Sequence, residues 1–195
     1  MTETLPPLEE LAGARLVSAL EKRFDTTIDQ FRVGKRTFSI LHPKNSDDLI
    51  REEDFEEDER LPYWADIWPS ATILAAQILG RPGEGRRLLE LGCGTGLVTT
   101  AAMASGYEVV ASDYYTDALA FTRANAFRNL GKTPQARMLN WRSFPPEEKE
   151  FDKVIASDVL YEPEYAKLLP GILKGALSLH GVAMIADPGR IGAPA

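Results

Sequence analysis

The chain has 195 residues, of which 44% are hydrophobic and 26% charged, an ordinary composition for one globular domain with a sizeable core. The net charge of −7 disfavours nucleic-acid binding, because contact with phosphates needs a basic face. A single cysteine, Cys93, excludes an intramolecular disulfide and a cysteine-rich metal site, and His42 and His180 lack ligand spacing, so we expect no metal.

The N-terminus reads MTETLPPLEE, which is acidic and lacks the basic region and apolar run of a signal peptide. No stretch of the sequence approaches the roughly 20 apolar residues that cross a bilayer. These two features predict a cytoplasmic protein that makes no membrane contact.

We divide the chain at about residue 62, into an N-terminal extension (1–61) and a second domain (62–195). In the extension, residues 8–23 have leucines at helical spacing and predict an amphipathic helix, and the alternation over 31–41 predicts a strand or bent hairpin.

Two polar segments complete the extension. Asn45 or Ser46 is suited to cap a short helix that runs to Ile50. The acidic run Glu52–Glu59 predicts a solvated loop or helix face, with the attraction of a cationic partner as the alternative.

From Pro69 onward, strands and helices alternate. Strands are predicted at 86–91, 107–112, 135–140, 151–157 and 181–186, and helices at 70–79, 97–105, 117–130 and 163–179, the last interrupted by Pro170 and Gly171. This alternation predicts a Rossmann-like, doubly wound α/β fold with a mostly parallel sheet and helices on both faces. Ligands bind such sheets beyond the carboxyl ends of the strands, where the strand order reverses.

One loop stands out in this domain. Residues 90–96 read ELGCGTG, with the spacing G-x-G-x-G between a predicted strand and a predicted helix. Glycine permits positive φ and lets a ligand approach the backbone, and the following helix offers free N–H groups. A purely structural tight turn is the alternative.

Two carboxylates narrow the choice of ligand. Asp113 ends the next predicted strand, where an acidic side chain can accept hydrogen bonds from ribose hydroxyls. Glu90 directly precedes the loop and would repel a pyrophosphate. A nucleoside with a cationic tail and no phosphate fits both, and S-adenosylmethionine is such a ligand.

The motif ELGCGTG resembles motif I of the seven-strand S-adenosylmethionine-dependent methyltransferases. Four more stretches follow the order found in one branch: LPYWADIWPSATILAAQIL (61–79), VVASDYYTDAL (109–119), ARMLNWRSF (136–144) and VIASDVLYEPEY (154–165). That branch contains protein lysine methyltransferases, including enzymes that act on the electron-transfer-flavoprotein β subunit and on chaperones. The resemblance implies a class I methyltransferase fold, S-adenosylmethionine as cofactor and a protein lysine as substrate.

The resemblance also implies site residues. Cofactor contacts are expected from Trp68, Glu90, Gly92, Cys93, Gly94, Thr95, Gly96, Asp113, Tyr114, Asn140, Trp141 and Ser157. Asp158 and Tyr161 match a D-x-x-Y element that faces the substrate nitrogen, and are the expected catalytic pair.

Structural alternatives stay open for several of these residues. Trp68 and the nearby Trp64 could be core aromatics rather than parts of an aromatic channel, and Tyr161 could pack under the last helix. Asp158 could cap that helix, and Cys93 could simply be a small residue in a tight loop.

Other functions are also open. A small-molecule N- or O-methyltransferase, a protein histidine methyltransferase and a non-catalytic binding module share these motifs. A nicotinamide dehydrogenase is disfavoured, because its G-x-G-x-x-G/A motif needs a small residue where Leu97 stands.

The chain departs from the resembled fold at its end. That fold has seven strands, the last two forming a hairpin, whereas this chain stops at Ala195, soon after the strand at 181–186. We expect a bare apolar edge strand there, with a missing C-terminal tail as the explanation and cover by a partner subunit or the N-terminal segment as the alternative.

Overall fold

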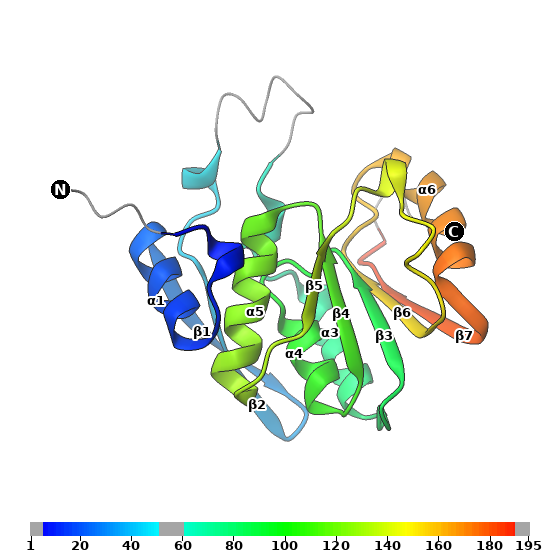
Figure 1. The fold of residues 1–195 in the computed structure, drawn as a ribbon, viewed down its shortest axis with the longest axis horizontal. Coiled ribbons are helices and arrows are strands. Elements are labelled where there is room, and N and C mark those ends of the chain that lie inside the picture. The colour runs from blue at the N-terminus through cyan, green and yellow to red at the C-terminus, as the bar shows by residue number, and fades with distance from the viewer. Residues whose placement is uncertain (1–5, 51–60, 190–195) are drawn as a thin grey trace.

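The computed structural model describes residues 6–50 and 61–189; the acidic run Glu52–Glu59 lies outside the described residues. Its centre is a five-stranded sheet of order β5-β4-β3-β6-β7, parallel at every pairing (Figure 1). The strands are β3 (Arg87–Leu91), β4 (Glu108–Asp113), β5 (Gln135–Met138), β6 (Phe151–Ser157) and β7 (Leu177–Ala186). The order reverses between β3 and β6, as expected for a doubly wound fold.

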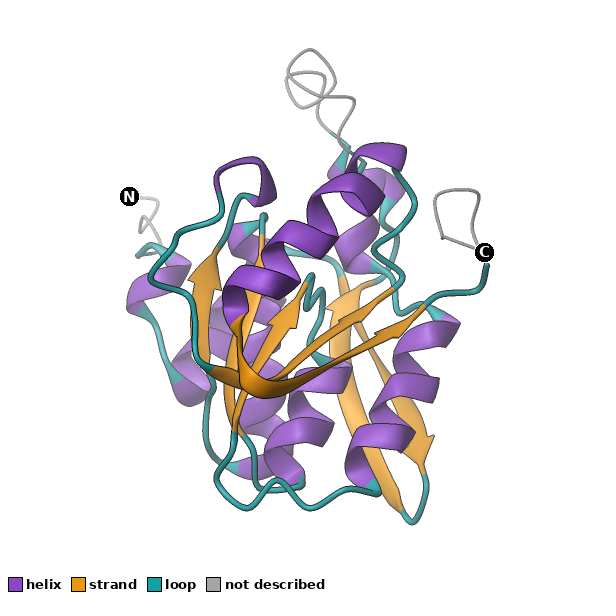
Figure 2. Cartoon of the chain, turned by 90° about the vertical axis from the view of Figure 1, so that its right-hand side faces the viewer, coloured by secondary structure: helices purple, strands orange, loops and turns teal. Residues whose placement is uncertain are grey.

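Helices cover both faces of this sheet (Figure 2). The helices are α3 (Pro69–Leu79), α4 (Leu97–Ala104), α5 (Thr116–Leu130) and α6 (Pro163–Ala176). Alternate strand residues explain the two layers. Leu88 and Ile155 join the cluster with Leu74 of α3 and Val98 of α4, whereas Leu89 joins the cluster of α6.

The N-terminal segment forms a further layer outside the helices. It contains α1 (Gly13–Arg23) and an antiparallel hairpin of β1 (Thr26–Val33) and β2 (Arg36–Pro43). Phe38 and Ile40 of β2 are buried with residues of α3 and α4, while Leu41 is buried with residues of α1 and α5. The hairpin is therefore packed onto the helices that carry the glycine loop.

The N-terminal predictions hold with shifted bounds. The predicted helix over 8–23 is a 3-10 turn at Leu8–Glu10 followed by α1, because Leu11 and Ala12 adopt extended backbone between them. The short helix is a 3-10 turn at Asp47–Leu49, in which the Asn45 Oδ1 accepts a hydrogen bond from the Asp47 N–H.

The end of the last helix is predicted wrongly. α6 runs through Pro170 without interruption, because Pro170 lies on the solvent side while Leu169 and Ile172 hold the helix on the sheet. The helix stops at Ala176, and β7 begins at once with an irregular stretch between its pairings with Phe151 and Lys153.

Gly181 makes this irregular stretch possible. A Cβ at Gly181 would lie 2.6 Å from the Phe151 carbonyl oxygen, so only glycine lets the two strands approach this closely.

The expectation of an apolar edge strand is confirmed for the described residues, in which β7 pairs with β6 alone. Leu179 is 92% exposed, and Val182 and Ile185 are also exposed along this edge. No described helix is long and apolar enough to cross a membrane.

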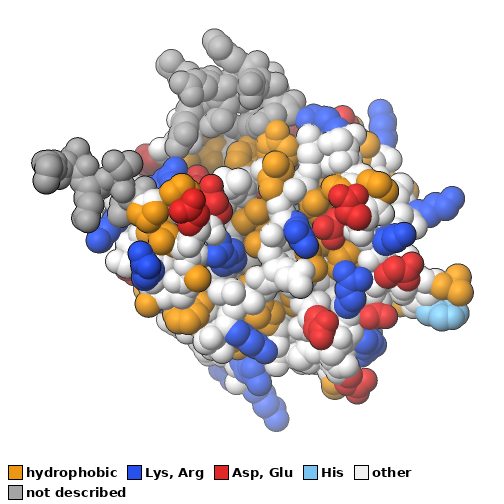
Figure 3. All heavy atoms as spheres, in the orientation of Figure 1, with side chains coloured by type: hydrophobic (Ala, Val, Ile, Leu, Met, Phe, Trp, Pro, Cys, Tyr) orange, Lys and Arg blue, Asp and Glu red, His pale blue; other side chains and the backbone are white. Residues whose placement is uncertain are grey.

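Charges are interspersed over the face of the molecule in Figure 3. Lysine and arginine side chains alternate there with acidic ones, so neither sign gathers into a single patch on this face.

Gly96 begins α4 with a φ of +87°, and a Cβ there would lie 2.7 Å from the Thr122 Cα on α5. Gly131 after α5 has a φ of +70° but nothing within 4 Å of its Cβ position. We expect Gly131→Ala to cost about 1–2 kcal/mol from backbone strain. Gly96→Ala should cost about 1–3 kcal/mol more, because it adds overpacking. Urea unfolding measures both, and an equal loss for the two variants would contradict the close contact between α4 and α5.

Candidate functional site

A cleft of about 440 Å³ opens at the carboxyl edge of β3, β4 and β6, beside the point where the strand order reverses. Every site residue expected from the sequence lines it: Trp68, Glu90, Gly92, Cys93, Gly94, Thr95, Gly96, Asp113, Tyr114, Asn140, Trp141, Ser157, Asp158 and Tyr161. Residues from five separate stretches of the chain therefore meet in one place.

The glycine loop forms the floor of the cleft. The Cys93 N–H donates to the Ser112 carbonyl oxygen at 2.9 Å, and the Gly96 N–H donates to the Cys93 carbonyl oxygen at 2.9 Å. A Cβ at Gly94 would lie 3.0 Å from the Trp64 carbonyl oxygen, so the loop is closely packed from below. The loop thus has one tightly held backbone path.

Cys93 contributes its small size rather than its chemistry. Its thiol is buried, and its Sγ lies 3.3 Å from the Thr122 hydroxyl oxygen, within hydrogen-bond distance. Burial raises the pKa of the Cys93 thiol well above its ordinary value, so the thiolate that a nucleophile needs is disfavoured.

The Asp113 side chain hydrogen-bonds to the loops that follow two neighbouring strands, β3 and β4. Its carboxylate accepts hydrogen bonds from the Gly94 N–H at 2.9 Å and from the Tyr115 N–H at 3.1 Å, one on each oxygen. Burial raises the pKa of Asp113, while these backbone donors oppose the rise. The side chain holds the glycine loop against the end of β4.

Glu90 lies deeper in the cleft and is only 1% exposed. Burial raises the pKa of Glu90 to about 8; the hydrogen bond donated by the Thr99 hydroxyl opposes the rise, and the nearby Asp113 adds to it. At neutral pH this carboxyl is therefore mostly protonated, and a cation placed beside it would favour loss of the proton.

Aromatic rings line the mouth of the cleft. Tyr63 contacts Trp68 and Tyr161 edge to face, with ring centroids 6.1 and 5.3 Å apart. Tyr165 of α6 continues the row, with its ring 5.3 Å from Tyr161 and 5.4 Å from Trp141. The Trp68 indole N–H donates to the Tyr63 carbonyl oxygen at 3.0 Å, which fixes this side of the row. Burial raises the pKa of the Tyr161 phenol, so it stays protonated.

Trp64 packs as a core aromatic rather than as part of the aromatic channel at the mouth. Trp64 is 9% exposed, and its ring lies 5.7 Å from Phe121 and 6.4 Å from Tyr115 within the cluster of α1 and α5. The sequence places Trp64 and Trp68 four residues apart, but only Trp68 joins the row of rings at the mouth.

Asp158 has an unusual backbone. It directly follows β6 with a φ of +58°, and its N–H donates to the Ala186 carbonyl oxygen at 2.9 Å. Its reading as a helix cap is wrong, because the N-cap of α6 is Glu162. A non-glycine residue in the left-handed region stores strain, and such residues cluster at functional sites.

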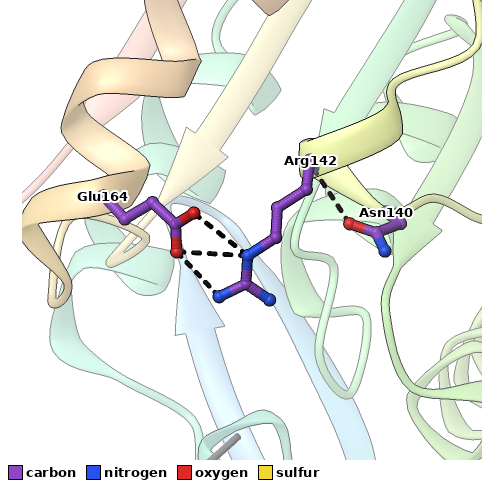
Figure 4. Close-up of polar contacts among 3 residues, drawn as sticks. All are labelled: Asn140, Arg142 and Glu164. Atoms are coloured by element: carbon purple, nitrogen blue, oxygen red, sulfur yellow. Dashed lines mark hydrogen bonds and ion pairs between the residues drawn. The ribbon is translucent and has the colours of Figure 1, made fainter.

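Arg142 and Glu164 close one wall of the cleft, and no sequence pattern predicted either residue. They form an ion pair of 2.7 Å between the 3-10 turn at Trp141–Ser143 and α6 (Figure 4). The Asn140 Oδ1 accepts a hydrogen bond from the Arg142 N–H at 2.9 Å and so caps that turn. Part of the Asn140 side chain is therefore committed to local structure.

Negative charge prevails in the cleft. Its described lining includes Arg142, already paired with Glu164, and the carboxyl groups of Asp66, Asp113, Asp158, Glu162 and Glu164, besides Glu90, which a nearby cation would ionise. Among the described residues, no group of three or more His, Cys, Asp or Glu side chains is arranged to hold a metal ion. The cleft suits an organic cation better than a phosphate.

Known proteins resemble this chain in sequence. Residues 45–190 match the family described as lysine methyltransferase. The electron transfer flavoprotein beta subunit lysine methyltransferases of Danio rerio and Xenopus laevis are 34% and 35% identical to it; each match covers 66% of this chain and 51% and 53% of theirs. Protein-lysine N-methyltransferase rrg1 of Schizosaccharomyces pombe is 29% identical, and the match covers 63% of this chain and 46% of the length of rrg1. The chain spans about half the length of these curated relatives.

Solved structures resemble it in fold. A SAM-dependent methyltransferase from Agrobacterium tumefaciens matches 82% of this chain and 52% of its own, with a TM-score of 0.58 and 12% identity. The PH0226 protein from Pyrococcus horikoshii OT3 matches 71% of this chain and 66% of its own, with a TM-score of 0.52 and 21% identity. At these identities the likeness concerns the fold, which is that of the class I methyltransferases.

The raised pKa of Glu90 predicts how stability depends on pH. The folded chain holds this proton up to about pH 8, while the unfolded chain releases it near 4.5. The stabilisation is therefore complete below pH 4.5 and is lost as pH rises toward 8, by at most about 1.4 kcal/mol per pH unit. Glu90→Gln should remove this slope in urea unfolding between pH 5 and 8. Glu108→Gln, at an exposed position, is the control, and equal slopes for Glu90→Gln and the unaltered chain would refute the prediction.

Proposed function

The chain belongs to the lysine methyltransferase family, and from this premise we propose that it transfers the methyl group of S-adenosylmethionine to a lysine side chain of another protein. The observation that carries the proposal is the meeting of Glu90, Asp113 and Asp158 in one cleft with a row of aromatic rings at its mouth. Relatives named as lysine methyltransferases of a protein subunit support the substrate class.

The donor set of the cleft fits this cofactor. The Asp113 carboxylate accepts backbone N–H groups from Gly94 and Tyr115, one on each oxygen, and interacts with the Tyr114 backbone, which still leaves lone-pair capacity for a ribose hydroxyl. Glu90 would hold a cationic part of the cofactor, with the glycine loop against the methionine and ribose portions. Tyr114, Asn140 and Trp141 would flank the adenine, and Trp68 and Ser157 would border the reactive end.

The bound cofactor supplies a methyl group that its sulfonium has already activated. The chain itself must therefore align the incoming nitrogen more than supply a strong acid or base. A lysine ammonium must lose a proton before its nitrogen can attack. The rings of Tyr63, Trp68 and Tyr161 would desolvate the lysine stem, which lowers the lysine pKa, and would orient the nitrogen by cation–π contact.

Asp158 would position the amine. A carboxylate beside an ammonium raises the pKa of that ammonium, so Asp158 is better suited to orienting the nitrogen and relaying its proton than to acting as a strong base. Its strained backbone at the end of β6 supports such a fixed orientation.

Two further parts of the proposal rest on the sequence alone. We assign the reaction to the cytoplasm, which the single cysteine supports. We also treat residues 1–61 as an extension and residues 62–195 as the methyltransferase domain, which the onset of regular strand and helix alternation near residue 62 supports.

Incubation with labelled S-adenosylmethionine and cell extract tests the substrate class. We expect a labelled protein band, with mass spectrometry placing the methyl group on lysine. Label on histidine would favour a protein histidine methyltransferase, and label only in small metabolites would favour a small-molecule methyltransferase. Calorimetry that detects no cofactor binding would instead favour a non-catalytic module.

Asp113→Ala should weaken the binding of S-adenosylhomocysteine by at least about tenfold, because the ribose loses a charged acceptor and the glycine loop loses the bond that holds it against β4. Asp152→Ala is a matched control, since the Asp152 carboxylate also accepts one backbone N–H, from Arg87, but at the opposite end of the sheet. Calorimetry measures both affinities. Equal affinities for the two variants would show that Asp113 does not bind the ribose.

Asp158→Asn should lower turnover by at least about tenfold while changing cofactor affinity less than twofold, since a charged hydrogen bond contributes about 1.5–3 kcal/mol. Asparagine tolerates the positive φ of this position, so the change removes charge without adding strain. Steady-state kinetics and calorimetry separate the two effects. A parallel fall in both quantities would place Asp158 among the cofactor contacts.

A further inference from the structure

Helix α5 has a row of polar side chains on a buried face. Thr122, Asn125 and Asn129 follow one another at helical spacing, and Thr122 and Asn125 are 0% exposed. Buried polar groups are costly unless they are hydrogen-bonded, so such a row inside an apolar interface needs a structural or functional reason.

Two members of the row pair with the hairpin as a neighbouring strand would. The Asn125 Oδ1 accepts from the Leu41 N–H at 2.8 Å, and its Nδ2 donates to the Leu41 carbonyl oxygen at 2.7 Å. Asn129 repeats this arrangement with Ser39, at 2.9 Å for both bonds. The two amides thus satisfy the edge of β2 that faces away from β1.

Asn125 makes one more bond, and this bond leads into the cleft. Its Nδ2 also donates to the Thr95 carbonyl oxygen at 2.8 Å, so both of its N–H groups are used. The loop residue just before Thr95 is held in the same way: the Thr122 hydroxyl of α5 donates to the Gly94 carbonyl oxygen at 2.9 Å. Asn129 makes no such bond to the loop: its other partner is the Asn125 carbonyl oxygen in its own helix.

These bonds fix the orientation of the loop peptides. The C=O and N–H of a trans peptide point in opposite directions. With the Gly94 and Thr95 carbonyls turned toward α5, the N–H groups of Thr95 and Gly96 point away from that helix. The backbone that lines the cleft is thereby held in one orientation before any ligand arrives.

We propose that Asn125 is a positioning residue that couples the N-terminal hairpin to the glycine loop. One side-chain amide holds Leu41 of β2 and Thr95 of the loop at the same time, so an ordered hairpin favours the loop orientation that binds the cofactor. By linkage, cofactor binding stabilises the hairpin in return. This inference rests on the proposed cofactor site and assigns a role in that site to the N-terminal segment.

The test compares Asn125→Ala with Asn129→Ala in the full chain, with S-adenosylhomocysteine as the probe. Both variants lose an amide that pairs with β2, so both should lower the unfolding midpoint. Only Asn125→Ala loses the bond to the loop. We expect it to weaken S-adenosylhomocysteine affinity at least tenfold in calorimetry, while Asn129→Ala stays within twofold of the unaltered chain.

Hydrogen exchange provides a readout that a merely structural role would not change. Saturating S-adenosylhomocysteine should slow exchange of the hairpin amides in the unaltered chain and in Asn129→Ala, and this slowing should be lost in Asn125→Ala. If Asn125→Ala does not fold, Asn125→Ser replaces it, because a water can then meet the backbone groups left behind.

Several outcomes would overturn the inference. Equal losses of affinity in the two alanine variants would reduce Asn125 to general support of the hairpin, and unchanged affinity in Asn125→Ala would remove its link to the loop. In both of these cases the unaltered chain still binds the probe, and the proposed function stands. Absence of binding by the unaltered chain would overturn the proposed function and this inference together.

Discussion

The site depends on the two backbone hydrogen bonds that the Asp113 carboxylate accepts. One donor, Gly94, belongs to the loop after β3, and the other, Tyr115, directly precedes α5. A single side chain therefore sets how two consecutive strand-to-helix junctions lie against each other. The contact between Gly96 and Thr122, the closed path of the glycine loop and the position of α5 against the hairpin all require these junctions to be in register.

The carboxyl groups of the cleft determine which ligand charge it favours. Carboxyl groups from β3, β4 and the end of β6 share a partly buried space, and burial raises the pKa values of Glu90 and Asp113. Such groups are held together by the fold rather than by mutual attraction. An organic cation relieves their repulsion, and a polyphosphate would increase it. The burial that raises these pKa values thus favours a cationic ligand over an anionic one, as the proposed cofactor site requires.

Short sequence patterns predicted the secondary structure and the residues that line the cleft. Strand and helix alternation predicted the sheet, and the glycine spacing with Asp113 predicted the residues that meet at the cleft. Contacts between residues far apart in the sequence are not encoded by any short sequence pattern. Arg142 and Glu164 are 22 residues apart, and Asn125 and Leu41 are 84 apart, so neither pairing has a period or motif. The irregular start of β7 depends on the close approach of Gly181 to the Phe151 carbonyl oxygen. Trp64 packs in the core against Phe121, which lies 57 residues later in the chain.

The backbone of Asp158 has a consequence for how the chain can vary. In the left-handed region, glycine, asparagine and aspartate are favoured, and β-branched side chains are strongly disfavoured. Conformation therefore restricts position 158 before chemistry does. A lineage that kept this fold but abandoned the reaction would still favour these three residues there. If Asp158 positions the amine as proposed, glycine or asparagine at this position would mark a descendant with lower turnover that remains well folded.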